Sequence, residues 1–372
     1  MQTIIKEIEK NIKLSNKKIE FRNNKLNTII HTSENIFYDD LKNFSKAFNE
    51  LFKSNKNNII KLNAYIINND NLYSKVLQFM NDKSLVLTKG IIDFNKATIA
   101  TSCAKCTQDF NYYIIKCYEY FIYVFDKREK RCFMLIKNNK KALTMINILI
   151  LTPYLMYGEM FAVHGGLVNK NDKNILINNS SLGGKTTFAI LFACNNWDII
   201  TEETTYITND GKILPFNIRN YFNIRVGTYL NFYDYFKSKK ILIDEFINMK
   251  DKTLIELYEA GKKNQQSIDF DKIGKFKNLK SEYITISLKV SIQKDKQFTI
   301  DTCSPIENVN SFLELSLAPT VLLFKEILDY NNKIDIDSRE KQLKKIFNNT
   351  KSYKIISGFD YKEHFNEIID KL

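Results

Sequence analysis

The segment Asn179–Thr187 holds the residues of this chain whose types and spacing are best suited to chemistry. It differs at one position from the phosphate-binding pattern G-x-x-x-x-G-K-[ST]. In that pattern backbone N–H groups surround the phosphates, the lysine reaches the outer phosphates, and the hydroxyl binds Mg²⁺. We therefore expect Lys185 to contact nucleotide phosphates and Thr186 to be a magnesium ligand. The expected nucleotide-binding residues are Asn179, Ser180, Ser181, Leu182, Gly183, Gly184, Lys185, Thr186 and Thr187.

Asn179 occupies the position at which the pattern has glycine. Glycine is usual there because the turn uses a backbone conformation that side chains disfavour. Asparagine tolerates the left-handed conformation better than most residues, so we expect the loop to survive the substitution. Five of the 11 glycines lie between Gly158 and Gly184. That concentration favours a phosphate loop over a surface loop that matches the pattern by chance.

Phosphoryl transfer also needs an acid that holds Mg²⁺, and commonly one that takes the acceptor's proton. Two acidic pairs follow short apolar runs. Glu202 and Glu203 come after Trp197–Ile200, and Asp244–Glu245 comes after Lys240–Ile243. The second pair resembles the apolar strand with Asp-Glu of ring-type and transporter ATPases. On strand pattern alone it is slightly the better match, so both pairs remain candidates.

Arginine could supply a further phosphate contact, because its planar guanidinium group binds two oxygens at once. Two arginines, Arg219 and Arg225, follow Pro215–Phe216 after the predicted hairpin. We take Arg219 as a candidate catalytic residue. The alternative is an ordinary exposed loop arginine.

Three elements must position these residues. The apolar run Ile175–Ile177 predicts a buried strand before the loop, and apolar residues at helical spacing predict a helix over Thr186–Cys194. A strand, a loop and a helix in this order bring the positive helix end to a bound anion. The run Trp197–Ile200 predicts a strand that ends at the Glu-Glu pair.

The flanking sequence predicts further elements. Tyr206–Leu214 has the pattern of a hairpin with an Asp-Gly turn. Helices are predicted at Tyr38–Ser54, Ala142–Leu151, Leu313–Tyr330 and Tyr361–Leu372, and strands at Tyr120–Phe125, Cys132–Ile136, Glu282–Ile292 and Tyr353–Ile356.

Composition sets the wider limits. The chain has 372 residues, which is enough for two domains or one large domain with additions, and its hydrophobic content of 44% supports a full core. A net charge of +13 should attract acidic partners such as nucleotides. The lysines are dispersed and accompany no nucleic-acid motif, so we expect no nucleic-acid binding.

Cysteine usage and hydropathy indicate a cytoplasmic protein. Cys103–Cys106 is a single C-x-x-C without a second pair, which favours free thiols over a zinc site. The charged N-terminus lacks the apolar core of a signal peptide. Ala142–Val163 is mostly apolar, but Pro153 and Glu159 interrupt it, so we expect a buried helix and no membrane span.

The stretch from His164 to Thr204 resembles the catalytic core of HPr kinase/phosphorylase and its relatives, which share a nucleotide-binding core with phosphoenolpyruvate carboxykinases. In that family a His-Gly dipeptide precedes a phosphate loop and helix, and the next strand ends in Asp-Asp. Here 21 positions separate His164 from Lys185, and 17 separate Lys185 from Glu202. Both spacings match the family pattern.

The resemblance implies an α/β (α+β) fold with an HPr kinase/phosphoenolpyruvate carboxykinase-like P-loop core and a mixed β-sheet. We expect this kinase domain over residues 139–372, preceded by a smaller, divergent α+β domain over residues 1–138. The arrangement looks most like the HPr-kinase-related peptide-tailoring serine kinases, some of which act on ribosomally made peptides such as lasso peptides.

The resemblance also implies roles for single residues. Thr186 and Glu203 would hold Mg²⁺, Glu202 would be the catalytic base, and His164 would lie near the transferred phosphoryl group. Lys185 and the loop amides would hold the β- and γ-phosphates. Glutamate replaces the family's aspartate at both acidic positions, which adds a methylene to each side chain and could change the acceptor, because catalysis needs close placement.

The resulting hypothesis is an ATP- or GTP-dependent kinase that uses Mg²⁺ and phosphorylates a Ser or Thr hydroxyl of a peptide, protein or small molecule. The alternatives are a non-catalytic nucleotide-binding regulatory or scaffold protein, and an ATPase that uses Asp244 and Glu245. The sequence leaves open the acceptor, the preferred base and the oligomeric state, a homo-oligomer included.

Overall fold

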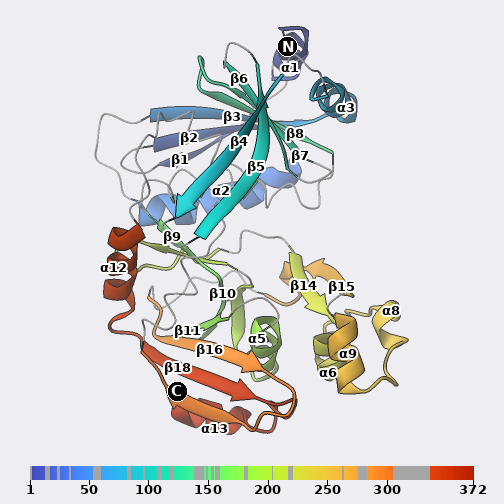
Figure 1. The fold of residues 1–372 in the computed structure, drawn as a ribbon, viewed down its shortest axis with the longest axis vertical. Helices are drawn as coiled ribbons and strands as arrows, with labels where there is room; N and C mark the ends of the chain where they lie inside the picture. The colour runs from blue at the N-terminus through green and yellow to red at the C-terminus, as the bar shows by residue number, and fades with distance from the viewer. Residues whose placement is uncertain are drawn as a thin grey trace. The chain divides into compact units, whose positions relative to one another are not determined.

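The chain forms two compact units, Met1–Met160 with Ser316–Ile336 and Phe161–Leu315 with Asp337–Leu372 (Figure 1). Residues 139–160 therefore group with the N-terminal unit, whereas the sequence analysis placed them in the kinase domain. The computed structural model describes residues 2–12, 17–22, 26–32, 35–52, 60–81, 85–94, 97–107, 111–117, 121–137, 146–147, 150–151, 155, 160–179, 183–202, 204–216, 221–261, 264–274, 283–304 and 336–372.

The N-terminal unit is built on an eight-stranded mixed sheet. Its strand order is β1-β2-β3-β8-β7-β6-β5-β4, in which β2, β3 and β8 run parallel and the other neighbours antiparallel. The strands are β1 (Lys17–Arg22), β2 (Leu26–Thr32), β3 (Ile60–Asn68), β4 (Val86–Phe94), β5 (Ala97–Cys106), β6 (Tyr112–Cys117), β7 (Phe121–Asp126) and β8 (Arg131–Ile136), and the helices are α1 (Gln2–Ile12), α2 (Asn35–Leu51) and α3 (Asp70–Phe79).

Helices cover this sheet because their apolar stripes need partners. The rings of Phe44 and Phe48 in α2 lie 5.1 and 5.8 Å from the ring of Phe21 in β1. Ile8 of α1 and Val76 of α3 join a second cluster with residues of β7 and β8. Every residue of β7 is buried, so both faces of the sheet are covered there.

The C-terminal unit contains a six-stranded mixed sheet of order β12-β10-β11-β16-β18-β17, in which β11, β16 and β18 run parallel. Two further two-stranded sheets pair β13 with β9 and β14 with β15. The strands are β9 (Met160–Val163), β10 (Gly165–Lys170), β11 (Lys173–Asn178), β12 (Asp198–Thr201), β13 (Thr205–Thr208), β14 (Tyr221–Arg225), β15 (Gln265–Asp269), β16 (Ile286–Ile292), β17 (Thr299–Thr302) and β18 (Lys351–Ser357). The helices are α5 (Lys185–Cys194), α6 (Val226–Asn231), α7 (Tyr233–Ser238), α8 (Asp244–Ile247), α9 (Leu254–Gly261), α12 (Ile336–Phe347) and α13 (Phe365–Lys371), with a short 3₁₀ turn at Phe270–Lys272.

Helix α5 is held in the core of this unit by aromatic contacts. The ring of Phe192 lies 5.1 Å from that of Trp197 and 5.4 Å from that of Phe365. The parallel strands β11 and β16 bring their carboxyl ends together, and α5 begins just after β11. This edge is where parallel sheets place ligands.

The chain is thus a mixed α and β protein with mixed sheets, as the sequence predicted. The predicted strand at Ile175–Ile177 and helix at Thr186–Cys194 are confirmed as β11 and α5. Thr208 and Lys212 close the predicted hairpin turn, with Gly211 at a φ of 91°. Leu313–Tyr330 and most of Ala142–Leu151 lie outside the described residues. No helix in the described ranges is long and apolar enough to cross a membrane.

Candidate functional site

The phosphate loop, Asn179–Thr187, leads from β11 into α5, and its backbone geometry depends on two glycines. Gly184 caps α5 with a φ of 98°, a left-handed conformation that glycine adopts without strain. A Cβ atom on Gly183 would lie 2.0 Å from Nδ2 of Asn179. Lys185 Nζ donates to the carbonyl oxygen of Asn179, 2.9 Å away, so the lysine spans the mouth of the loop.

Asn179 acts differently from the prediction. The expectation was a left-handed backbone at this position, but Asn179 is not among the described residues with positive φ. Its side-chain amide instead donates to the carbonyl oxygens of Val290 in β16 and of Gly183, the latter at 3.3 Å. The asparagine therefore ties the loop to the neighbouring parallel strand, a contact that glycine could not make.

The first acidic candidate lies beside this loop. Thr186 Oγ1 donates to Oε1 of Glu202 at 3.3 Å, and Glu202 is 5% exposed. Thr201, at the end of β12, accepts from the N–H of Leu167 at 3.1 Å, which fixes the strand end that carries Glu202. A Cβ atom on Gly166 would lie 2.7 Å from the Glu202 carbonyl oxygen. Glycine at this position thus permits β10 to lie against the backbone of Glu202.

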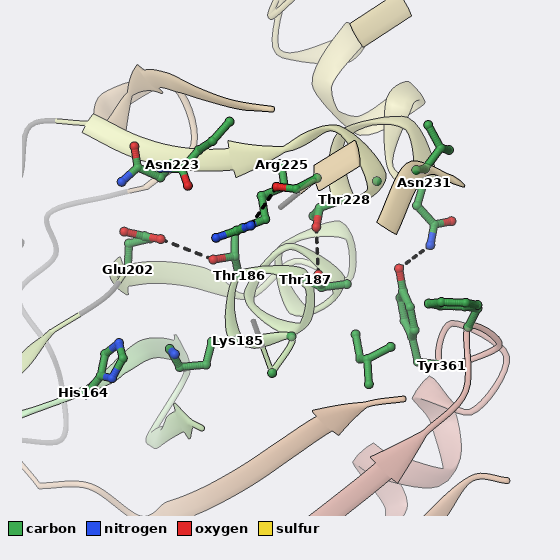
Figure 2. Close-up of a pocket in the computed structure, with 18 residues that line it drawn as sticks. His164, Lys185, Thr186, Thr187, Glu202, Asn223, Arg225, Thr228, Asn231 and Tyr361 are labelled. Atoms are coloured by element: carbon green, nitrogen blue, oxygen red, sulfur yellow. Dashed lines mark hydrogen bonds between the residues drawn. The ribbon is translucent and has the colours of Figure 1, made fainter. Parts of the chain in front are cut away.

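Lys185, Thr186 and Glu202 line one pocket of about 200 Å³, which Figure 2 shows in close-up. His164, Lys185 and Glu202 occupy one end, and Asn231 and Tyr361 occupy the other. All of its residues belong to the C-terminal unit. The lining comprises His164, Gly183, Gly184, Lys185, Thr186, Thr187, Glu202, Asn223, Arg225, Gly227, Thr228, Asn231, Leu257, Gly261, Gln265, Ile292, Phe359 and Tyr361.

Hydrogen bonds connect the two ends of the pocket. Thr187 Oγ1 and Thr228 Oγ1 are 2.8 Å apart, which joins the first turn of α5 to α6. One helical turn farther along α6, the Asn231 amide donates to the hydroxyl of Tyr361. Burial raises the pKa of the Tyr361 hydroxyl, although the hydrogen bond from Asn231 lowers it in part, so this phenol is neutral at ordinary pH.

The arginine that reaches the pocket is Arg225, at the end of β14. Its Nη1 donates to the carbonyl oxygen of Gly261 at 2.7 Å, which holds the guanidinium group between β14 and α9. Arg219, Glu203, Ser180, Ser181 and Leu182 lie outside the described residues. The structure therefore brings together His164, Gly183–Thr187 and Glu202, and their predicted roles stay predictions.

The second acidic candidate does not belong to this site. The predicted strand at Lys240–Ile243 is wrong: these residues form no strand, and Asp244 and Glu245 are exposed at the start of the short helix α8. The physical reason is Tyr229, whose hydroxyl donates to the carbonyl oxygen of Ile241 and accepts from the N–H of Ile243, both at 3.1 Å. A side chain thus takes the backbone groups that a neighbouring strand would have used.

Sequence reasoning missed several residues that line the pocket. Asn223, Thr228, Asn231 and Tyr361 belong to segments that follow the phosphate loop by dozens of positions or more than a hundred. None carries a local motif. The signal available in the sequence was Arg225, which lies between Asn223 and Thr228 and has a side chain suited to phosphate, although the sequence favoured Arg219 as the candidate.

The residues of the site fit Mg²⁺ that is bound together with nucleotide phosphates, and they do not fit a metal site built from protein ligands alone. Within the described part of the chain, no group of three or more His, Cys, Asp or Glu residues could hold a metal ion. Mg²⁺ commonly takes only one or two protein oxygens and completes its shell with phosphate and water. The hydroxyl of Thr186 is one such oxygen and lines the pocket, where it donates to Glu202 at 3.3 Å.

No protein-family model matches this sequence, and no curated protein is detectably similar to it.

Proposed function

We propose that the C-terminal unit is a phosphotransferase that moves the terminal phosphoryl group of ATP or GTP to a Ser or Thr hydroxyl on a peptide, protein or small molecule. The observation that carries this proposal is one pocket in which the start of α5, Lys185 and Glu202 meet. A cation, a helix N-terminus and a buried carboxylate are what phosphate binding and transfer require together.

Phosphate binding would fall to the loop and its lysine. The unpaired N–H groups in the first turn of α5 and the partial positive charge of the helix end favour an anion. Lys185 now donates to the loop carbonyl of Asn179, so a phosphate oxygen would replace that carbonyl as its acceptor. Glycines at positions 183 and 184 leave the backbone open to close approach.

Glu202 would act on the acceptor. In the transfer step a bond forms between the acceptor oxygen and the terminal phosphorus, the bond from that phosphorus to the β–γ bridging oxygen breaks, and the nucleoside diphosphate leaves. The acceptor's hydroxyl proton goes to the carboxylate of Glu202. Thr186 and the predicted ligand Glu203 would hold Mg²⁺, which when bound neutralises negative charge on the phosphates. The hydrogen bond from Thr186 orients Glu202 for this task.

The residues around the terminal phosphate would supply electrostatic stabilisation. His164 lies in the turn between β9 and β10 and lines the same end of the pocket as Lys185. Arg225 reaches the pocket from β14 and is held by its bond to Gly261. Hydrogen-bond donors and positive groups fixed in place before the reaction stabilise the charge that develops during phosphoryl transfer.

Thermal unfolding with and without Mg-ATP or Mg-GTP tests whether the protein binds a nucleotide, which the proposal requires first. A ligand at about 100 times its dissociation constant adds about 2.7 kcal/mol to the free energy of unfolding, which raises the melting temperature by several degrees. We expect this shift in the wild type and its loss in Lys185→Ala. Lys170→Ala is the control, because Lys170 is exposed on β10 of the same sheet and does not line the pocket. A wild type that responds to neither nucleotide would refute the proposal.

A further inference from the structure

The half of the pocket away from Lys185 has a different chemistry from the phosphate end. The ring of Tyr361 lies at this end (Figure 2), and Ile292, Phe359 and Leu257 are further apolar residues of the pocket lining. The carboxamide of Asn231 and the hydroxyl of Tyr361 are polar groups at this end (Figure 2). Apolar walls with one or two directed polar groups are typical of sites that hold an organic ring rather than a phosphate.

Asn231 is positioned by its neighbours and keeps hydrogen-bonding capacity. Its Nδ2 donates one hydrogen to the Tyr361 hydroxyl, and its backbone carbonyl accepts from Lys362 Nζ. A carboxamide has a second N–H and a carbonyl oxygen. In the described part of the chain, the hydrogen bond found for the Asn231 side chain is the one to Tyr361. The side chain can therefore present a donor beside an acceptor to a ligand, and each nucleobase carries an acceptor beside a donor on one of its edges.

Residues of α5 and α6 connect the phosphate end of the pocket to the end that contains Asn231. Thr187 follows Thr186, the predicted magnesium ligand, and the hydroxyl of Thr187 lies 2.8 Å from that of Thr228 in α6. Asn231 is three residues beyond Thr228 on α6, a spacing that places both on one helix face. Figure 2 shows Thr187 and Thr228 between the Lys185 end and the Tyr361 end.

We infer that this end is the nucleobase subsite of the proposed kinase, with Asn231 as the group that reads the base edge and Tyr361 as the residue that positions it. The inference rests on the proposed function, because the base would enter as part of the nucleotide whose phosphates Lys185 binds. Phe359, which lines the same pocket, would contact a face of the base. Tyr361, 3% exposed and packed 5.9 Å from the ring of Phe188, fixes the carboxamide of Asn231 from behind.

The subsite predicts that the base contributes to binding beyond the phosphates. The test compares the dissociation constants of Mg-tripolyphosphate, which has no base, with those of Mg-ATP, Mg-GTP, Mg-CTP and Mg-UTP by titration calorimetry. We expect the wild type to bind at least one nucleotide roughly tenfold or more tightly than tripolyphosphate, the usual effect of one or two directed hydrogen bonds with apolar contacts. The preferred nucleotide identifies the base.

Two substitutions locate the effect. Asn231→Leu removes the hydrogen-bonding edge at similar size, and Tyr361→Phe removes only the hydroxyl that positions it. Both should weaken binding of the preferred nucleotide about tenfold, reduce discrimination among the four bases and leave tripolyphosphate binding unchanged. Tyr353→Phe is the matched control, because Tyr353 is a buried tyrosine of β18 that does not line the pocket. Circular dichroism and the unliganded melting temperature confirm that each variant folds.

The outcomes separate the two proposals. If the wild type binds tripolyphosphate and all four nucleotides equally, the phosphate site stands and the nucleobase subsite is refuted. If it prefers one nucleotide but Asn231→Leu and Tyr361→Phe keep that preference, the base lies elsewhere and the assignment is refuted. If it binds neither tripolyphosphate nor any nucleotide, the proposed function fails and the subsite fails with it.

Discussion

The two acidic pairs of this chain look alike in sequence, but Glu202 of the first pair and Glu245 of the second lie in different surroundings. Each follows a short apolar run, and the run before Asp244–Glu245 is the better strand pattern. Only the run before Glu202 forms a strand, β12, which is buried beside β10. Glu202 is 5% exposed and contacts Thr186, whereas Glu245 is exposed and contacts Gln266.

The difference shows that neighbouring elements, more than local pattern, decide which acid can do chemistry. Gly166 permits the close approach of β10 to Glu202, and α5 supplies the hydroxyl that meets it. The other run lies beside Tyr229, whose hydroxyl bonds its backbone groups and prevents strand pairing. Asp244 and Glu245 lie in the first turn of the four-residue helix α8 and do not line the pocket that contains Lys185.

The largest expected effect is on phosphoryl transfer. Glu202→Gln removes the proposed proton acceptor while keeping the shape of the side chain, so we expect the transfer rate to fall by about 100-fold to 10,000-fold, the usual contribution of a general base. Glu245→Gln should change it less than twofold. The measurement is the initial rate of transfer from labelled ATP to a Ser- and Thr-containing peptide library.

Glu202→Gln and Glu245→Gln also distinguish a kinase from an ATPase that uses Asp244 and Glu245. Acceptor-independent ATP hydrolysis that is lost in Glu245→Gln and retained in Glu202→Gln would overturn the comparison. Nucleotide binding by both variants should stay within about threefold of wild type, because neither substitution removes Lys185 or the loop glycines; that result would show that the loss in Glu202→Gln is in the chemical step.

The parts of the site that follow each other in sequence could be predicted. The strand before the loop, the helix after it and the Asp-Gly hairpin turn depend on residues a few positions apart, and burial periodicity or turn chemistry reveals them. The same applies to Gly184, whose left-handed conformation fits a residue that begins a helix after a tight loop.

The parts that depend on tertiary packing could not be predicted. Asn231 and Tyr361 lie 130 positions apart in the chain, yet they share a hydrogen bond. The role of Asn179 follows from β16, more than one hundred residues later, because its amide reaches the carbonyl oxygen of Val290. A single sequence does not show which distant strand becomes the neighbour of a loop, so the left-handed interpretation of Asn179 was the natural one and was wrong.

An effect of intermediate size is expected when Gly166, which packs against the backbone of Glu202, is substituted; the quantity affected is the free energy of unfolding. In Gly166→Ala the new Cβ atom would lie 2.7 Å from the carbonyl oxygen of Glu202 and 3.2 Å from that of Thr201. Both are backbone atoms at the end of β12 or just after it, so relief requires the backbones of β10 and this segment to separate. We expect a loss of about 1–3 kcal/mol in the free energy of unfolding, measured by urea denaturation.

Gly227→Ala is the matched control for that prediction. Its nearest contact would be the carbonyl oxygen of Leu257 at 3.6 Å, an ordinary van der Waals separation, and it lies within α6. Alanine favours a helix over glycine by about 0.5–1 kcal/mol, so this variant should be as stable as the wild type or slightly more so. Equal losses in both variants would show that the close approach at Gly166 has no special cost.

The smallest expected effect compares a buried contact near the first acid with an exposed contact at the second. Thr187 and Thr228 share a hydrogen bond of 2.8 Å between buried hydroxyls, whereas Gln266 and Glu245 meet at the surface. In double-mutant cycles, Thr187→Val with Thr228→Val should give a coupling energy of about 1 kcal/mol, since each single variant leaves a buried hydroxyl without its partner. Gln266→Ala with Glu245→Ala should give less than about 0.5 kcal/mol, because water replaces an exposed contact at little cost. Coupling of equal size at the two places would mean that burial does not distinguish them, and the contrast between the two acidic regions would then rest on the chemistry of Glu202 alone.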